Sequence, residues 1–236
     1  MAFALRAERM QLVRDLLAAW LVLEPGATGP LRLCDLGGTG DWWRQHGEGL
    51  AGLGRPVLVD LVNLSPQPVP ESLPDLTLRA RVGDARALPE VPDGDYDLVF
   101  SNSVIEHVGV FAEQLRMARE VARIGRNYLV QTPNRWFPVE PHFLVPGWQF
   151  LPRDLRVFLH QRFRCGWYGR ADSYLRARAT VDEVQLLDRR DLRAMFPTAL
   201  ILRERVAGLT KSLVVWGGAV ATERPEVLAM PAHYRR

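Results

Sequence analysis

A glycine-rich segment after an apolar run is the part of this chain best suited to binding a ligand. The run Leu31–Leu36 is followed by Gly37, Gly38 and Gly40. Glycine has no Cβ, so the backbone of such a loop can come close to a bound molecule. Asp60, twenty residues after Gly40, closes a second apolar run and is placed to accept hydrogen bonds from ribose hydroxyls. Together these features predict a nucleoside-containing cofactor across the ends of a parallel sheet.

The class of cofactor depends on the residue three positions after Gly40. The dinucleotide fingerprint needs a third glycine there, because the following helix must pack closely on the strand. This chain has Trp43 at that position, which is a poor fit for packing over a pyrophosphate. A glycine loop followed by an acid serves both dinucleotides and S-adenosylmethionine, so these two features alone leave both classes open.

Alternating apolar and amphipathic segments predict the elements that position these residues. Strands are expected at Leu31–Leu36, Pro56–Asp60, Leu76–Val82, Tyr96–Ser101, Asn127–Gln131, Leu200–Val206 and Ser212–Trp216. Helices are expected before Glu24, from Asp41 to about Leu53, and at Phe111–Ile124 and Leu192–Phe196. This alternation predicts an α/β fold with a doubly wound, seven-stranded, mostly parallel sheet. The turn at 207–211 has the length of a hairpin loop, so the last strand is expected to be antiparallel.

Two connections depart from this alternation. Prolines between Pro66 and Pro74 leave room for no more than a stub of helix after the second strand. After the fifth strand, residues 132–190 form a long insertion with an amphipathic helix around Arg153–Phe163. Long connections at the carboxyl edge of a parallel sheet are usually functional, so the insertion is expected to cap the cofactor crevice.

The chain length predicts one domain whose core needs no disulfides or metal. It has 236 residues, of which 47% are hydrophobic. The expected parts are an N-terminal helix (1–24), a cofactor-binding half (31–131), the cap (132–190), the end of the sheet (191–217) and a tail (218–236) that is poorly ordered from Thr222.

Charge and cysteine content exclude several other classes. The net charge is +3, and the positive charges are dispersed arginines with one lysine, Lys211, so a nucleic-acid surface is not indicated. Cys34 and Cys165 lie far apart, and no Cys/His cluster has the spacing of metal ligands. Charged residues interrupt the N-terminal apolar residues, which excludes a signal peptide and a membrane span there. We therefore expect a cytoplasmic protein without a metal.

Four motifs in order resemble the class I, seven-stranded S-adenosylmethionine-dependent methyltransferases, in their broad small-molecule branch. They are the glycine loop Asp35–Gly40, the acid Asp60, Gly83-Asp84-Ala85 after the third strand, and Tyr96–Val108 with its Glu106-His107 pair. The resemblance runs from about Leu31 to Trp216, and an antiparallel last strand fits it. It implies S-adenosylmethionine as the cofactor.

The resemblance also implies which residues bind that cofactor. They are Asp35, Gly37, Gly38, Gly40, Asp60, Leu61, Asp84, Ala85, Asn102 and Ser103. The glycine loop would meet the methionine end, braced by Asp35 through backbone N–H groups, and Asp60 would accept from both ribose hydroxyls. Asp84 would accept from the adenine amino group, with the Ala85 N–H facing a ring nitrogen. Asn102 and Ser103 would lie where the fourth strand opens onto the sulfonium.

Simpler roles remain open for two of these acids. Asp60 could be a solvated acid in a turn, and Asp84 could be the N-cap of a helix at 85–88.

Two histidines are candidates for a general base. His107 follows the fourth strand near the expected point of methyl transfer, and the pKa of a histidine suits the deprotonation of a hydroxyl. His142 lies in the cap, next to Glu140 across Pro141. Either histidine could instead hold its loop in place.

The acceptor is expected to be a small molecule, anionic or aromatic, that is methylated at oxygen or nitrogen; a natural product, a sugar and a lipid-linked glycan are the classes considered. Arg162, Arg164 and Arg170 alternate with aromatic residues and could form a solvated face, an anion site or a nucleic-acid surface. The Asn/Asp-Pro-Pro-aromatic motif of many enzymes that methylate bases is replaced by residues 101–104, Ser-Asn-Ser-Val. A nucleic-acid methyltransferase and a catalytically silent cofactor-binding partner are the alternatives, and a dehydrogenase comes last.

Overall fold

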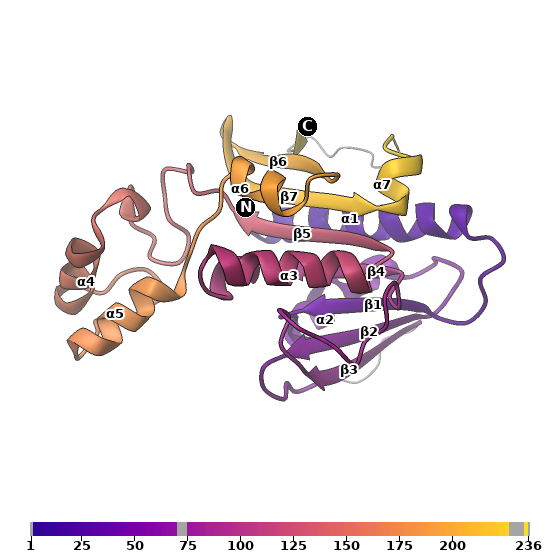
Figure 1. Ribbon diagram of the computed structural model, residues 1–236, viewed down its shortest axis with the longest axis horizontal. Coiled ribbons are helices and arrows are strands. Elements are labelled where there is room, and N and C mark those ends of the chain that lie inside the picture. Colours follow the sequence, from indigo (N-terminus) through magenta and orange to yellow (C-terminus); the bar gives the residue numbers. More distant parts are fainter. Residues whose placement is uncertain (1, 70–74, 227–233, 236) are drawn as a thin grey trace.

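The computed structural model, which describes residues 2–69, 75–226 and 234–235, folds around one mixed β-sheet (Figure 1). The strand order is β3-β2-β1-β4-β5-β7-β6-β8. The strands are β1 (Leu31–Leu36), β2 (Val57–Asn63), β3 (Leu76–Val82), β4 (Leu98–Asn102), β5 (Asn127–Pro133), β6 (Leu200–Val206), β7 (Leu209–Gly218) and β8 (Tyr234–Arg235). Neighbours among β1 to β5 are parallel, and β7 is antiparallel to β5 and β6. The predicted α/β class and antiparallel strand are confirmed.

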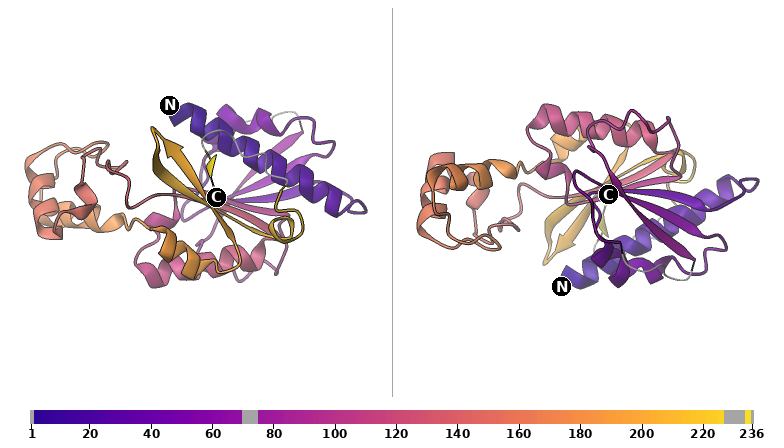
Figure 2. Two further views of the ribbon diagram at one scale, coloured as in Figure 1. Left: turned by 90° about the horizontal axis from the view of Figure 1, so that it is seen from above. Right: turned by 90° about the horizontal axis from the view of Figure 1, so that it is seen from below.

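Helices cover both faces of the sheet, as the views along it show (Figure 2). They are α1 (Ala2–Leu23), α2 (Gly40–His46), α3 (Phe111–Ile124), α4 (Arg153–Arg162), α5 (Tyr174–Glu183), α6 (Arg189–Met195) and α7 (Ala219–Glu223), with 3-10 turns η1 (Gly47–Leu50), η2 (Ile105–His107) and η3 (Trp148–Phe150). Leu16, Trp43 and Val220 contribute to the core on the face of α1, α2 and α7. Val121 and Leu192 contribute to the core on the face of α3 and α6. Both faces of the strands are thus buried, as expected for a parallel sheet.

A buried ion pair joins α1 to β6. Arg9 Nη2 lies 2.6 Å from Glu204 Oε2, and the hydroxyl of Tyr234 donates to Glu204 Oε1 at 2.8 Å. Glu204 is fully buried, so these partners offset the cost of removing its charge from water. Tyr234 is buried too, so the prediction of a poorly ordered tail is wrong at β8; residues 227–233 lie outside the described residues.

Two predicted boundaries were wrong near the glycine loop. The second strand was expected to end at Asp60, but β2 continues to Asn63 because its pairing with β1 and β3 continues through Val62 and Asn63. The helix after the loop was expected to reach about Leu53, but α2 ends at His46 and η1 follows. Residues 64–69 contain no helix, as the prolines indicated, and residues 70–74 lie outside the described residues.

Residues 135–186, called the lobe below, form a small body with its own core. That core includes Phe143, Trp148, Val157 and Val181. α4 and α5 pack on one another in it, and α5 had no counterpart among the expected helices. Figure 1 shows the lobe projecting beyond the end of β5, on the left. That the insertion caps the cofactor crevice stays a prediction.

Candidate functional site

A cavity of about 370 Å³ opens at the carboxyl ends of β1, β2, β3 and β4. We call it the strand-end cavity. It is lined by Gly37, Val62, Asn63, Leu64, Ser65, Gln67, Gly83, Asp84, Ala85, Arg86, Val104, His107 and Val108. Ligands of open α/β sheets bind at this edge. Among the residues expected to touch the cofactor or the acceptor, Gly37, Asp84, Ala85 and His107 line this cavity.

The glycine loop is shaped by contacts within the protein. Gly37 has φ +77°, a conformation that favours glycine, and a Cβ there would collide with the side chain of Val104. A Cβ on Gly38 would collide with the carboxylate of Asp35. Gly40 begins α2, whose first turn is capped by Thr39. Gly38 and Gly40 therefore support the loop without lining the cavity.

Trp43 and Asp35 are hydrogen-bonded to each other beneath the glycine loop, which accounts for a tryptophan at position 43. Its indole Nε1 donates to Asp35 Oδ2 at 2.7 Å, and both residues are buried. Burial raises the pKa of Asp35 to about 7, although the bond from Trp43 opposes that rise. Asp35 thus holds the loop through an indole N–H rather than through the backbone N–H groups that we expected.

Asp60 does not reach the strand-end cavity. It lies inside β2, 4% exposed, and its Oδ2 accepts from the Tyr96 hydroxyl at 2.8 Å and from Arg81 Nη1 at 3.3 Å. Leu61, beside it, belongs to the sheet core. The prediction that an acid at position 60 ends the strand is therefore wrong.

Asn63 occupies the place expected for that acid. It ends β2 and lines the strand-end cavity, and its Nδ2 donates to Gly38 O at 2.9 Å. That bond leaves Oδ1 as an acceptor for a ligand. The signal in the sequence was the apolar pair Leu61-Val62, which continues the strand beyond Asp60.

Asp84 and Arg86 form a turn just after β3, next to the end of β2. Asp84 Oδ1 accepts from the Arg86 backbone N–H at 2.9 Å, and Oδ2 lies 2.6 Å from Arg86 Nη2. The hydrogen bond from Arg86 lowers the pKa of Asp84. Residues 84–87 make a tight turn instead of a helix, so the N-cap alternative is wrong.

Asn102 and Ser103 are bound to the protein itself. Asn102 Oδ1 accepts from Arg9 Nη1 at 2.7 Å. The hydroxyl of Ser103 donates to Gln131 Oε1 at 2.9 Å, and its φ of 58° turns the chain out of β4. Neither residue lines the strand-end cavity, contrary to expectation.

A chain of close contacts joins the lobe to the cavity. His107 Nε2 lies 3.2 Å from His142 Nε2, and His142 Nδ1 lies 2.6 Å from Glu140 Oε1. Glu140 Oε2 accepts from the backbone N–H groups of His142 and Phe143. The carboxylate fixes the His142 tautomer that carries its proton on Nδ1, which leaves the Nε2 lone pair facing His107.

The two histidines have opposite pKa shifts. Burial, followed by the neighbouring His142, lowers the pKa of His107 to about 4. Burial also lowers the pKa of His142, but its hydrogen bond to Glu140 and the charge of Glu140 together raise it above the usual value. His142 is therefore the stronger base of the pair, and His107 stays neutral near pH 7.

Glu106 lies below the histidines in η2. It is fully buried, Oε2 accepts from Thr132 Oγ1 at 2.9 Å, and burial raises its pKa to about 7. The ligand atoms of Glu106, His107 and His142 lie within 4.8 Å of one another, so the fold builds a possible metal-binding group that the sequence spacing did not indicate.

Residues 48–127 match the family model described as "Methyltransferase domain". Two uncharacterised proteins of Mycobacterium tuberculosis, from strains CDC 1551 and H37Rv, are each 31% identical over 83 residues. That segment is 35% of this chain and 28% of each relative, so the chain matches under a third of their length. No helix of the described residues is both long and apolar enough to cross a membrane.

Three solved structures are similar to this chain at low identity. Magnesium protoporphyrin IX methyltransferase from Synechocystis PCC 6803, with bound SAH, is 15% identical (TM-score 0.42, 87% of this chain, 81% of that one). The CMeT domain of the citrinin polyketide synthase is 15% identical (0.49, 80% and 46%), and a protein from Pyrococcus horikoshii OT3 is 13% identical (0.46, 83% and 84%). In residues 48–127 and in its strand order, this chain resembles the class I S-adenosylmethionine-dependent methyltransferases.

Proposed function

We propose that this protein transfers the methyl group of S-adenosylmethionine to an oxygen or nitrogen atom of a small molecule. The observation that carries the proposal is the contact between His107, which lines the strand-end cavity, and His142, which is held by Glu140. A base thus lies beside the site where the cofactor's methyl group would be.

The residues of the strand-end cavity fit this cofactor. Asn63 Oδ1 would accept from a ribose hydroxyl in the role first expected of Asp60. Asp84 keeps lone pairs for the adenine amino group despite its bonds to Arg86, and the Ala85 N–H would meet a ring nitrogen. Val62 and Val104 supply apolar contacts, and the loop at Gly37 admits the methionine end.

The reaction needs alignment more than activation. S-Adenosylmethionine supplies a methyl group on a positively charged sulfur, which keeps the electron pair of the broken C–S bond. The acceptor atom forms the new bond to that methyl carbon from the opposite side, and positioning supplies much of the rate.

His142 would take the acceptor's proton. The His142 Nε2 lone pair faces His107, so an acceptor hydroxyl would displace that contact and donate its proton to His142 while its oxygen attacks the methyl carbon. The resulting imidazolium is stabilised by Glu140, which already raises the pKa of His142. His107, neutral near pH 7, would hold the hydroxyl without adding positive charge beside the sulfonium.

The proposal is tested by incubating the protein with S-adenosylmethionine that carries a labelled methyl group and a host metabolite extract. Mass spectrometry should find a labelled small molecule with wild-type protein and far less of it with His142→Gln. Label in nucleic acid would contradict the proposal and favour a nucleic-acid methyltransferase. Cofactor binding without any labelled product would favour a silent binding partner. A cytoplasmic location stays a prediction from the sequence.

A further inference from the structure

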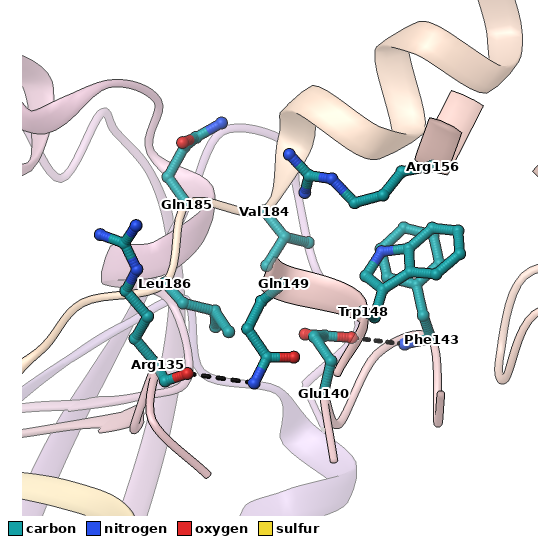
Figure 3. Close-up of a pocket in the computed structure, with 9 residues that line it drawn as sticks. All are labelled: Arg135, Glu140, Phe143, Trp148, Gln149, Arg156, Val184, Gln185 and Leu186. Carbon is teal, nitrogen blue, oxygen red and sulfur yellow. Dashed lines mark hydrogen bonds between the residues drawn. The ribbon is translucent and has the colours of Figure 1, made fainter. Parts of the chain in front are cut away.

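A second, smaller cavity lies within the lobe, lined only by residues of the lobe (Figure 3). We call it the lobe cavity. Its volume is about 130 Å³, and its lining residues are Arg135, Glu140, Phe143, Trp148, Gln149, Arg156, Val184, Gln185 and Leu186. Cavities for whole drug-sized ligands are typically about 300–1,000 Å³. The lobe cavity is therefore sized for one chemical group of a larger molecule.

Arg156 is the feature of the lobe cavity that most needs a partner. Its side chain makes no hydrogen bond or ion pair with any other described residue, and its Nε is buried. Burial lowers the pKa of this guanidinium. Arg156 is half-buried, so only part of its guanidinium is removed from water, and an anion in the lobe cavity would offset that cost.

The nearest carboxylates are already bound elsewhere. Asp182 accepts from Arg153 Nε at 2.8 Å and from Arg178 Nε at 2.6 Å. Glu140 is held by His142 Nδ1 and by two backbone N–H groups. Both carboxylates attract the Arg156 guanidinium electrostatically, but neither forms a hydrogen bond or ion pair with it in the described part of the chain.

Two neutral groups in the lobe cavity also lack partners. Trp148 is 1% exposed, and its Nε1 donates to no described residue. Gln149 Nε2 donates to the carbonyls of Arg135 and Phe137, which fixes the amide and leaves Oε1 buried without a donor. In Figure 3 the Gln149 amide and the indole of Trp148 lie on opposite sides of the Glu140 carboxylate. The groups without partners are thus two donors, Arg156 and Trp148, and one acceptor, Gln149 Oε1, which suits an oxyanion next to a hydroxyl or amide.

The lobe cavity is linked to the strand-end cavity. Glu140 lines the lobe cavity and holds His142, which touches His107 at the strand-end cavity. Gln185, another lining residue, donates its backbone N–H to the carbonyl of Glu106 at 2.8 Å. A molecule anchored in the lobe cavity would therefore extend toward the two histidines.

We propose that the lobe cavity binds a carboxylate or phosphate group of the methyl acceptor, with Arg156 and Trp148 as donors. This inference rests on the proposed function and narrows its substrate class to small acidic molecules. The exposed Arg162 and Arg164, which the sequence offered as an anion site, lie outside the lobe cavity, and Arg162 lies over the ring of Phe158.

The test uses inorganic phosphate and acetate as probes of the full chain at constant ionic strength. The readout is the NMR signal of the Trp148 indole N–H, assigned by its loss in Trp148→Phe. Either probe should shift that signal saturably in the wild type, and the tighter one identifies the group. Arg156→Gln should weaken the binding at least tenfold, as expected for the loss of a charged hydrogen bond. Arg176→Gln, an exposed arginine of the lobe, should change it less than twofold.

The absence of a saturable shift, or equal affinity in Arg156→Gln, would overturn the inference. If that variant folds poorly, Arg156→Met, which keeps the apolar stem, should show the same loss. Titration of the same samples with S-adenosylhomocysteine separates the two proposals. Cofactor binding without an anion effect rejects the lobe cavity alone, whereas anion binding without cofactor binding rejects the proposed function.

Discussion

His107 and His142 are 35 residues apart in the sequence, yet their Nε2 atoms lie 3.2 Å apart and their rings meet edge to face. One belongs to η2 at the end of β4, and the other belongs to the lobe. The contact brings a histidine with a lowered pKa against one with a raised pKa. Pairs whose environments separate their pKa values in this way are typical of acid–base sites.

The first prediction concerns the base itself. We expect His142→Gln to lower kcat by about 10²–10⁴-fold, the usual contribution of a general base. Affinity for S-adenosylhomocysteine should stay within twofold, because His142 does not line the strand-end cavity. Steady-state kinetics and calorimetry measure the two quantities. A normal kcat per folded molecule in this variant would show that His142 is not the general base of the reaction.

The second prediction concerns the pH dependence of turnover. A base must be unprotonated to act, and the pKa of His142 is raised, so kcat should increase with pH through a value above 6.5. Glu140→Gln removes the charge that raises this pKa, so the rise should move to lower pH while the plateau falls. Rate profiles between pH 5 and pH 9 test this. An unshifted profile in Glu140→Gln would assign the titration to another group.

The third prediction separates Asn63 from Asp60. Asn63→Ala should weaken binding of S-adenosylhomocysteine by about 0.5–1.5 kcal/mol, the usual worth of a neutral hydrogen bond. Asn63→Asp offers the ribose a stronger acceptor but loses the bond that Nδ2 donates to Gly38 O, so it should lower the melting temperature of the free protein. Asp60→Asn should leave the affinity within twofold and lower the melting temperature, since Asp60 binds Tyr96 and Arg81. Weaker binding in Asp60→Asn and unchanged binding in Asn63→Ala would show that Asp60, and not Asn63, accepts from the ribose.

Most of the sheet could be predicted from the sequence because apolar runs and turns are local signals. β1 and β3 have the expected bounds, as does α3. The end of β2 was misjudged because an acid usually ends a buried strand, whereas Asp60 is accommodated inside by Tyr96 and Arg81.

The site was less predictable because its key contacts are between distant segments. Gly37, Asp84, Ala85 and His107, which the motifs identified, line one cavity, and their roles stay predictions. No local pattern shows that His142 would meet His107, or that Arg156 would be left without a carboxylate in a cavity. The sequence predicted the helix around Arg153–Phe163, which α4 confirms, but not how the rest of the lobe packs. The contact and the cavity both depend on that packing.

The fourth prediction concerns the buried Asp35. Its pKa in the folded protein is about 7 against an ordinary value of 3.8, so the protonated carboxyl stabilises the fold. That stabilisation is complete below pH 3.8 and is lost as the pH rises through 7. Asp35→Asn keeps an acceptor for Trp43 and removes the charge. The free energy of unfolding of the variant, relative to wild type, should therefore increase with pH by a few kcal/mol, since one pKa unit corresponds to about 1.4 kcal/mol.

Urea denaturation of both proteins at pH 4.5, 6 and 8, without ligand, measures that difference. Wild-type and variant curves that stay parallel across this range would mean that Asp35 is charged in the folded protein. In that case the hydrogen bond from the Trp43 indole would lower the pKa of Asp35 by at least as much as burial raises it.

The most direct test of the central claim is calorimetric titration of the wild-type protein with S-adenosylhomocysteine, and separately with NAD. The account predicts saturable binding of one S-adenosylhomocysteine per chain, weakened by Asn63→Ala, and no measurable binding of NAD. Tight binding of NAD, or no binding of S-adenosylhomocysteine to folded protein, would contradict it.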